Sequence, residues 1–238
     1  MSLRSGEAIG VILAGGTGTR LGLDIPKQLV RLDGTTILER SVAAMHACPE
    51  VDEVYVMMAA DWVRPAREEL GDGYAKLRGV FPGGMTRNQT TERVLGLLGP
   101  EDRKILLHDA VRPFLSRRLV RDCVAALDAN AAVDVAIASA DTIVEVDSDN
   151  RIVAMPDRSR LRRGQTPQGF WLSVLRQAYR AAAEDPEFWA TDDCGVVHRY
   201  LPDVPIAVVE GSERNMKVTH ATDLVVAAAL LRDDEGER

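Results

Sequence analysis

The chain has 238 residues, of which 46% are hydrophobic, and its net charge is −7. This length allows one globular domain with a full core, and the acidic balance argues against general nucleic-acid binding, which needs a basic surface. No apolar run reaches the ~18 residues of a membrane helix, and the first ten residues lack the apolar core of a signal peptide. The three cysteines are widely spaced and predict no disulfide framework, so we expect a reduced, cytoplasmic protein.

Short apolar runs alternate with helical patterns along the chain. This alternation predicts a mostly parallel sheet with helices on both faces. A T-x-x-E capping signature, Thr36 with Glu39, precedes one helix, and Ser116 is the expected N-cap of another. In chain order we expect a strand at 8–14, a helix at 35–47, strands at 53–58 and 104–108, a helix at 116–130, strands at 133–139 and 206–210, and a helix at 221–232.

Residues 139–165 break this alternation. They alternate like a hairpin around "DSDN" and then become strongly basic. We therefore expect this stretch to leave the sheet as a protruding arm.

The loop "LAGGTGTRLG" at 13–22 directly follows the first apolar strand, and its glycines let the backbone approach an anion closely. It is not a P-loop, and Leu21 stands where a dinucleotide fingerprint needs its third glycine. The acidic residue that such a fingerprint requires about 20 positions later is also missing, which excludes an NAD-type oxidoreductase. Arg20 and Lys27 add two cations, so we expect a ligand with more negative charge than a pyrophosphate diester.

Two more polar loops follow apolar runs: "GGMTRN" at 83–88 follows "GVF", and "DAVRP" at 109–113 follows the strand expected at 104–108. Parallel sheets bind ligands at the carboxyl ends of their strands, so the three loops are expected at one edge. A simpler interpretation stays open for each loop. The glycine pair could form a plain turn leading into a helix, and Asp109 could form an ion pair with Arg112. Thr166 and Thr191 could bind a hydroxylated ligand or cap helices. The four histidines show no metal-ligand spacing, and no Ser/His/Asp or Cys/His set predicts covalent catalysis.

Taken in order, "LAGGTGTRLG…PKQ", "GG…RN", "HDAVRP", "TPQ", "TDD" and "N-x-KVT" resemble the CTP-dependent cytidylyltransferases that act on polyol phosphates. The resemblance spans about 8–225 and implies one domain, 1–238, with the Rossmann-like nucleotidyltransferase fold and a protruding β-arm at 139–165. "GGTGTRLG", "HDAVRPF" and "GQTPQGF" favour the D-ribitol 5-phosphate branch. An acceptor of the methylerythritol 4-phosphate branch (isoprenoid precursor synthesis), a sugar phosphate, a phosphonate, or a non-catalytic nucleotide sensor are the alternatives.

The resemblance also implies roles for individual residues and partners. The acceptor phosphate would attack the α-phosphorus of CTP, with Mg²⁺ held mainly by the CTP phosphates and no protein metal ligand assigned. A homodimer is implied, in which the arm brings Thr142 and Arg158 to the neighbour's acceptor site, with no nucleic-acid or membrane partner. The implied catalytic residues are Arg20, Lys27 and Lys217; the nucleotide-binding residues are Leu13, Ala14, Gly15, Gly16, Thr17, Gly18, Gly83, Gly84, Arg87, Thr90, Asp109 and Ala110; the acceptor-binding residues are Arg112, Thr142, Arg158, Thr166, Thr191 and Asp192.

Overall fold

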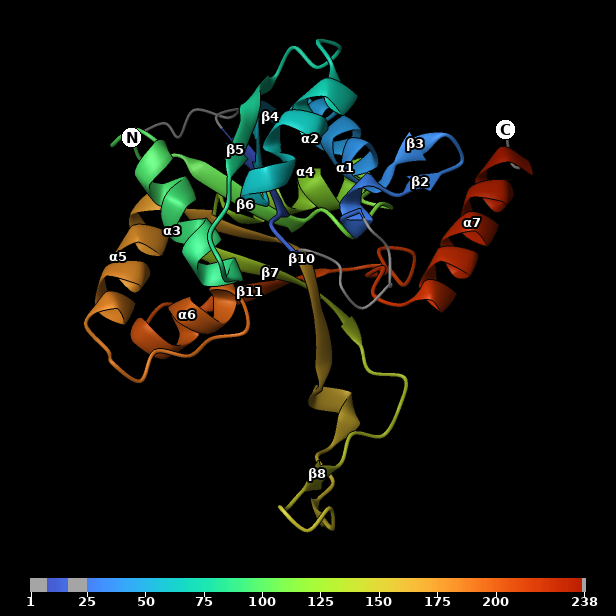
Figure 1. The fold of residues 1–238 in the computed structure, drawn as a ribbon. Coiled ribbons are helices and arrows are strands. Elements are labelled where there is room, and N and C mark those ends of the chain that lie inside the picture. The colour runs from blue at the N-terminus through green and yellow to red at the C-terminus, as the bar shows by residue number, and fades with distance from the viewer. Residues whose placement is uncertain (1–7, 17–24, 237–238) are drawn as a thin grey trace.

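The computed structural model describes residues 8–16 and 25–236, which form a seven-stranded sheet with helices on both faces (Figure 1). The strand order is β11-β7-β10-β6-β1-β4-β5. All neighbours are parallel except β10, which runs antiparallel to β6 and β7. The mostly parallel Rossmann-like sheet is therefore confirmed. Its strands are β1 (Ala8–Ala14), β4 (Val51–Met58), β5 (Leu77–Pro82), β6 (Lys104–Asp109), β7 (Ala132–Ala138), β10 (Arg162–Trp171) and β11 (Ile206–Glu210).

The central strand β1 is buried along its whole length because helices cover both faces of the sheet. Ile12 faces one apolar cluster, shared with α1 (Ile37–His46), α2 (Val63–Leu70) and α4 (Arg117–Ala126). Val11 faces the other, shared with α3 (Arg87–Leu97), α5 (Leu172–Ala183) and α6 (Asp193–Tyr200). Alternate residues of one strand thus anchor the two helical layers. Among the described residues, no helix is long and apolar enough to cross a membrane.

Side-chain caps fix where the helices begin. Thr36 accepts a hydrogen bond from the Glu39 amide at 3.1 Å, as the capping signature predicts. The Glu39 carboxylate, however, accepts from the Tyr74 hydroxyl at 3.0 Å. Ser116 caps α4 as predicted, and that helix ends at Ala126 rather than at residue 130. A complete capping box, Thr86 with Gln89, begins α3, the helix that directly follows the second glycine pair.

The largest difference from expectation is β10, which contains "GQTPQGF" and lies in the middle of the sheet. Its proline and glycines have low strand preference, so the sequence patterns do not predict a strand here. Its pairing with β6 and β7 makes it one. A Cβ at Gly169 would lie 2.7 Å from Val133 Cγ2, so the packing of β10 against β7 requires glycine there. The ladder of β10 with β7 shifts register between Gly164 and Gln168, where three residues of β10 lie opposite Val135 as a bulge.

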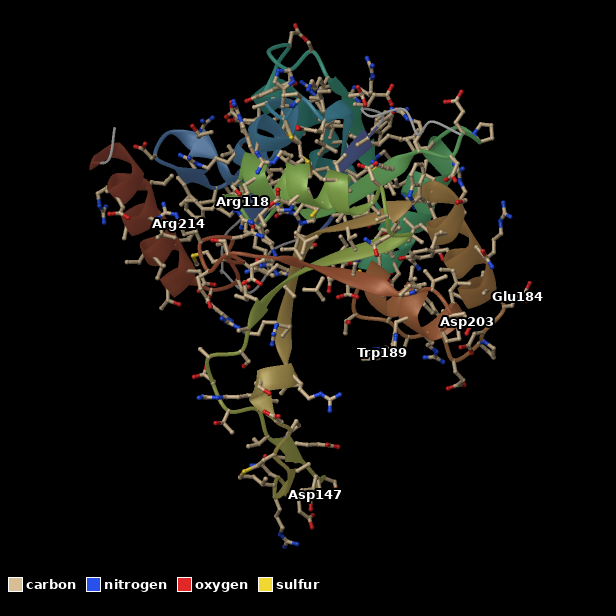
Figure 2. All side chains as sticks on the ribbon, turned by 180° about the vertical axis from the view of Figure 1, so that it is seen from behind. Arg118, Asp147, Glu184, Trp189, Asp203 and Arg214 are labelled. Atoms are coloured by element: carbon tan, nitrogen blue, oxygen red, sulfur yellow. The ribbon has the colours of Figure 1, made fainter. Side chains whose placement is uncertain are left out.

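The predicted arm leaves the sheet between β7 and β10 and projects far from it (Figures 1 and 2). It holds the hairpin β8 (Glu145–Val146) and β9 (Ile152–Ala154), followed by a 3-10 turn, η4 (Arg158–Arg160). Asp147 marks the far end of the arm in Figure 2. Six large apolar side chains of the arm are exposed: Ile143, Val144, Val146, Ile152, Val153 and Met155.

The remaining elements form a small satellite layer beside the sheet. The 3-10 turn η2 (Lys27–Leu29) leads into the hairpin β2 (Arg31–Leu32) and β3 (Thr35–Thr36). The C-terminal helix α7 (Ala221–Gly236) packs beside this hairpin, where Leu32, Val218 and Ala227 share an apolar cluster. A further 3-10 turn, η3 (Ala60–Trp62), precedes α2. The turn η2 thereby holds Lys27 at the edge of the sheet.

Candidate active site

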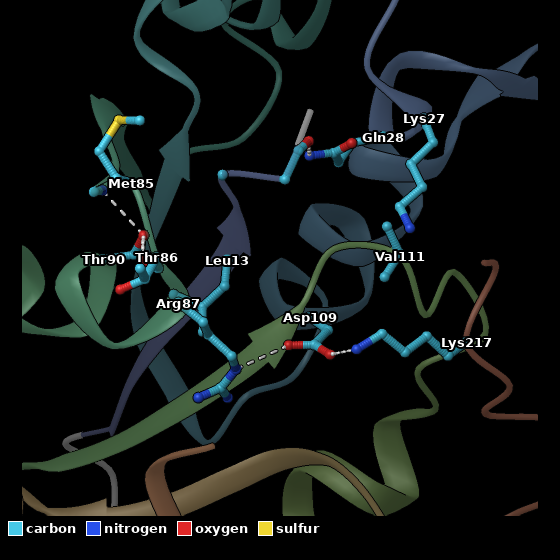
Figure 3. A pocket seen from close by; sticks show the side chains of 13 residues that line it. Leu13, Lys27, Gln28, Met85, Thr86, Arg87, Thr90, Asp109, Val111 and Lys217 are labelled. Carbon is cyan, nitrogen blue, oxygen red and sulfur yellow. Dashed lines mark hydrogen bonds and ion pairs between the residues drawn. The ribbon is translucent and has the colours of Figure 1, made fainter. Parts of the chain in front are cut away.

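The three loops predicted at one sheet edge meet around a cavity of about 290 Å³ (Figure 3). They follow β1, β5 and β6, whose carboxyl ends point the same way because these strands are parallel. In the view of Figure 3, Lys27 and Lys217 lie on one side and Met85 and Thr86 on the other. The described lining residues are Leu13, Gly15, Gly16, Lys27, Gln28, Gly84, Met85, Thr86, Arg87, Thr90, Asp109, Val111 and Lys217.

The first glycine loop is tied to the lysine turn by Gln28. Its amide nitrogen donates to the carbonyls of Ala14 and Gly16, the latter at 2.7 Å. Lys27, the preceding residue, lines the cavity and is 7% exposed. Gln28 therefore holds the first glycine loop next to the turn that carries Lys27. Thr17, Gly18 and Arg20 lie outside the described residues.

The second glycine pair is held by Thr90 on α3. The Gly84 amide donates to Thr90 Oγ1 at 3.0 Å, and the Thr90 hydroxyl donates to the Thr86 carbonyl at 2.9 Å. A Cβ at Gly84 would lie 2.4 Å from Gln89 Cβ, so the close turn onto the helix needs glycine. Gly83 donates to the Met58 carbonyl at 2.7 Å, which fixes the loop to β4. Met85 is 93% exposed at the rim of the cavity.

Asp109 lies at the end of β6 between two cations. Its Oδ2 accepts from Lys217 Nζ at 2.8 Å, and its Oδ1 lies 3.5 Å from Arg87 Nε (Figure 3). Burial raises the pKa of Asp109, but the charges of Arg87 and Lys217 outweigh it and hold this pKa well below its usual value. The carboxylate is therefore ionised and offsets part of the positive charge of the site.

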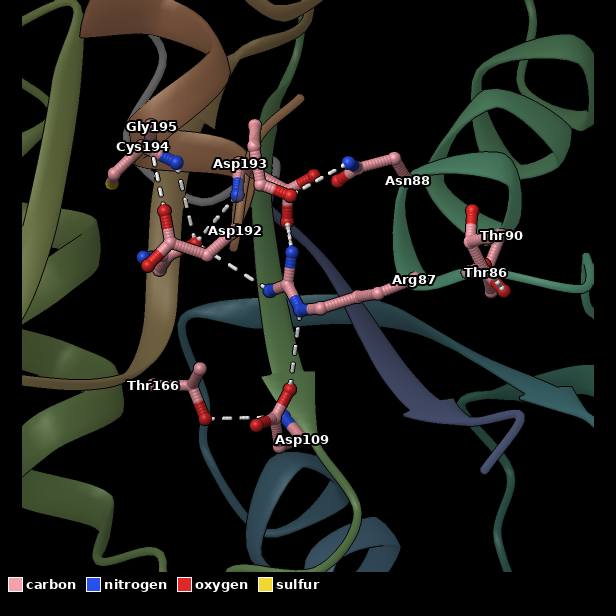
Figure 4. A network of polar contacts seen from close by, with 12 residues as sticks. Thr86, Arg87, Asn88, Thr90, Asp109, Thr166, Asp192, Asp193, Cys194 and Gly195 are labelled. Atoms are coloured by element: carbon pink, nitrogen blue, oxygen red, sulfur yellow. Dashed lines mark hydrogen bonds and ion pairs between the residues drawn. The ribbon is translucent and has the colours of Figure 1, made fainter. Parts of the chain in front are cut away.

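Arg87 is fixed by a buried network that the sequence analysis missed (Figure 4). Its Nη1 donates to Asp193 Oδ2 at 2.5 Å, and the Tyr179 hydroxyl donates to the other oxygen of Asp193 at 2.6 Å. Gln168 Oε1 accepts from Arg87 Nη2 at 3.4 Å. Asp193 is fully buried, so its ion pair fixes the position of the Arg87 guanidinium in the site. The second acid of "TDD" was the available signal, but nothing in the local pattern links it to Arg87.

A second cavity of about 210 Å³ adjoins the first. Arg87, Asp109 and Lys217 line both cavities. The other lining residues of the second cavity are Arg112, Gly164, Gln165, Thr166, Gln168, Thr191 and Asp192. The structure thus brings together four of the six predicted acceptor residues, Arg112, Thr166, Thr191 and Asp192.

Several of these predicted residues also have structural partners. Thr166 Oγ1 accepts from the Asp109 amide at 3.1 Å and lies 3.0 Å from His108 Nδ1. The His108 Nε2 lies 3.1 Å from the Arg112 carbonyl, which only accepts, so the Nε2 nitrogen carries the proton. Burial lowers the pKa of His108 to about 4, which keeps the ring neutral. Asp192 caps α6 by accepting from the Gly195 amide at 2.7 Å.

Five described residues with predicted roles line neither cavity: Ala14 and Gly83, whose contacts are given above, and Ala110, Thr142 and Arg158. Ala110 does not line either cavity; its amide donates to the Leu13 carbonyl at 3.0 Å and ties β6 to β1. Thr142 and Arg158 lie on the arm, where Arg158 Nη1 donates to the Ala140 carbonyl at 3.2 Å. Their contribution to a neighbouring subunit stays a prediction.

The two cavities are equipped for phosphate chemistry. Lys27, Arg87, Arg112 and Lys217 surround them, and the described lining residues include no Ser, Cys or His that could act as a covalent nucleophile. Fixed cations stabilise the charge that develops when a phosphoryl group moves between two bound partners. The arrangement therefore suits direct, in-line transfer between ligands held in adjoining cavities.

Comparison with known proteins agrees with this chemistry. Residues 8–233 match the model of the family IspD, 2-C-methyl-D-erythritol 4-phosphate cytidylyltransferase. The chain is 52% identical to 2-C-methyl-D-erythritol 4-phosphate cytidylyltransferase from Thermobifida fusca over 93% of this chain and 92% of that one. It is 36% identical to the bifunctional ribulose 5-phosphate reductase/CDP-ribitol pyrophosphorylase Bcs1 from Haemophilus influenzae, over 97% of this chain and 49% of that one.

The fold agrees as well. The solved 4-diphosphocytidyl-2C-methyl-D-erythritol synthase from Anaerococcus prevotii superposes with a TM-score of 0.85 at 28% identity, over 96% of this chain and 100% of that one. The chain therefore belongs to the 2-C-methyl-D-erythritol 4-phosphate cytidylyltransferase family and is a CTP-dependent cytidylyltransferase.

Proposed function

We propose that this chain transfers CMP from CTP to 2-C-methyl-D-erythritol 4-phosphate and releases pyrophosphate. The observation that carries the proposal is the pair of adjoining cavities that share Arg87, Asp109 and Lys217. A two-substrate transfer needs such a junction, because the reacting atoms must meet there. The motif-based preference for ribitol 5-phosphate gives way here, because the family and the relative at 52% identity carry the methylerythritol name. Ribitol 5-phosphate remains the second candidate on the similarity to Bcs1.

The first cavity is assigned to CTP and the second to the acceptor. Lys27, together with the predicted Arg20, would hold the triphosphate, and Lys217 would reach the α-phosphate from the junction. An acceptor phosphate oxygen attacks the α-phosphorus, and the bond to the β-phosphate oxygen breaks as pyrophosphate leaves. A phosphate monoester has a second pKa of about 6, so the attacking oxygen is already ionised at pH 7. The protein then supplies alignment and charge rather than a general base.

Mg²⁺ is proposed to arrive with the nucleotide. Among the described residues, no three His, Cys, Asp or Glu side chains are placed to hold a metal together. Asp109 is the one carboxylate among the described lining residues of the first cavity, and Lys217 and Arg87 already engage it. This donor set fits Mg²⁺ held mainly by phosphates and water, as that cation prefers. When bound, the ion would neutralise charge on the leaving pyrophosphate.

The arm is proposed to form a homodimer. Its six exposed apolar side chains are unusual for a projecting hairpin in water. A second copy would cover them and bring the partner's arm to the acceptor cavity, with Thr142 and Arg158 in the predicted roles. The three cysteines are free, as expected in a reduced compartment, so we keep the cytoplasm as the proposed location.

Pyrophosphate release with purified protein and Mg²⁺ tests the proposal. Four nucleotides are crossed with methylerythritol 4-phosphate, ribitol 5-phosphate, glycerol phosphate, a sugar 1-phosphate and a phosphonate. Turnover with CTP and methylerythritol 4-phosphate is expected. Turnover with only another acceptor would contradict the proposed substrate. Silence across the panel, with CTP still binding, would favour a nucleotide sensor.

A further inference from the structure

Asp134 on β7 is a carboxylate beside the acceptor cavity that no motif singles out. It pairs with Gln168 across the β7–β10 ladder, and its Oδ1 accepts from Gln168 Nε2 at 3.1 Å. Gln168 lines the acceptor cavity. The amide of Gln168 cannot turn around, because its Oε1 already accepts from the amides of Asp193 and Cys194. One oxygen of Asp134 is therefore held in place by a rigid partner.

The other oxygen of Asp134 lies beside Gly164, which lines the same cavity. A Cβ at Gly164 would lie 3.6 Å from Asp134 Oδ2, so no side chain at that position stands between them. Between Gly164 and Gln168 the ladder bulges, with three residues of β10 opposite Val135. Asp134 itself is only partly buried. Asp134 therefore lies next to two residues that line the cavity, Gly164 and Gln168, without being one of the lining residues itself.

Charged residues of both signs line this cavity: the cations Arg87, Arg112 and Lys217, and the carboxylates Asp109 and Asp192. Arg87, Arg112 and Lys217 supply positive charge next to the junction with the nucleotide cavity. Asp192 lines the cavity, and its charge and that of Arg112 both act on Asp134. The phosphate of an acceptor would meet these cations, and hydroxyl groups along its remaining chain would lie near Asp192 and the neighbouring Asp134. Carboxylates accept hydrogen bonds from hydroxyl groups and repel other anions.

We infer that Asp134, with its orientation set by Gln168, accepts a hydrogen bond from a hydroxyl of the acceptor and so selects an uncharged polyol phosphate over a phosphorylated sugar acid. This inference rests on the proposed function and names a specificity residue for its acceptor site. A site built to accept from a hydroxyl discriminates strongly, because its carboxylate is left without a donor when the hydroxyl is missing.

Calorimetric titration tests the inference directly. Methylerythritol 4-phosphate and D-erythronate 4-phosphate, which carries a carboxylate, are titrated into protein saturated with Mg²⁺ and a non-hydrolysable CTP analogue. The variants are Asp134→Asn, which keeps the size and the Gln168 hydrogen bond but places an amide toward Gly164, and Asp122→Asn, a control at a carboxylate on α4 that pairs with Arg118. We expect Asp134→Asn to weaken polyol phosphate binding about 3- to 10-fold, because a neutral hydrogen bond from the amide replaces the charge-assisted one. The same change should improve relative binding of the acid, with CTP affinity unchanged.

The outcomes separate this inference from the proposed function. An unchanged ratio of the two affinities in Asp134→Asn would overturn the inference, as would equal losses for acceptor and CTP. If wild type binds ribitol 5-phosphate instead, the proposed acceptor fails, and the same comparison with ribonate 5-phosphate still decides the role of Asp134. If wild type binds no polyol phosphate at all, both fail. Thermal melts of each variant show that the fold is intact.

Discussion

Lys217→Met removes the cation at the junction of the two cavities and leaves a side chain of similar length. The lost ion pair with Asp109 spans 2.8 Å, but the Lys217 side chain is 46% exposed and Arg87 still pairs with Asp109. Such a half-exposed pair contributes about 1 kcal/mol or less to stability. For a chain of this size we therefore expect the melting temperature to fall by no more than about 4 °C.

The effect on turnover should be much larger than the effect on stability. Removing one fixed donor from the site of developing charge costs about 10²–10³ in kcat, or about 2.7–4 kcal/mol. CTP affinity should change less than about fivefold, because the glycine loop and Lys27 remain. Initial rates of pyrophosphate release and calorimetric CTP binding measure the two effects separately. The matched control is Arg31→Met, which breaks an ion pair with Glu69 at 2.7 Å. The Arg31 side chain is 55% exposed, and neither residue lines a cavity. The reasoning is refuted if Lys217→Met keeps kcat within threefold, or if CTP affinity falls as much as kcat.

Lys27→Ala should lower kcat about 10²–10³-fold in the same assay, and a change within threefold would make Lys27 a structural charge. Arg158→Ala should raise the KM of the acceptor without weakening CTP binding; lost CTP affinity in a titration would contradict its placement. Val153→Asp with Met155→Asp should shift the protein toward monomer in sedimentation, because charge would enter the proposed interface, whereas an unchanged state would exclude the arm as that interface. Burial raises the pKa of Asp134 from 3.8 to about 6, so its ionised form costs the fold at most about 3 kcal/mol at pH 7.5. Asp134→Asn should therefore raise the melting temperature at pH 7.5, by an amount that shrinks as pH falls through 6 toward 4; a gain independent of pH would be inconsistent with the raised pKa.

Local sequence patterns predicted the features that depend only on residues close together in the chain. The buried run at 8–14, the Thr36 and Ser116 caps and the loops at the strand ends all follow from residues near one another in sequence. β10 does not, because "GQTPQGF" has little strand preference and is a strand only through its two neighbours.

The same limit applies to the site. The glycine loops and Asp109 each follow an apolar run, so their meeting could be predicted from parallel topology. The roles of Asp193 and Tyr179 could not be predicted. Asp193 lies 106 residues from Arg87 in the sequence, and Tyr179 acts on Arg87 only through Asp193. Asp134 looked like one polar residue in an alternating strand. Only the register of β10 places it beside the acceptor cavity.

A competition assay tests the central claim most directly. Equal concentrations of methylerythritol 4-phosphate and ribitol 5-phosphate are supplied with limiting CTP, Mg²⁺ and wild-type protein, and the two CDP products are separated by mass. Their initial ratio reports the ratio of kcat/KM for the two acceptors. We predict that the methylerythritol product dominates by at least about tenfold, which corresponds to ~1.4 kcal/mol of discrimination in the transition state. A dominant CDP-ribitol product would contradict the proposed acceptor and restore the preference drawn from the motifs.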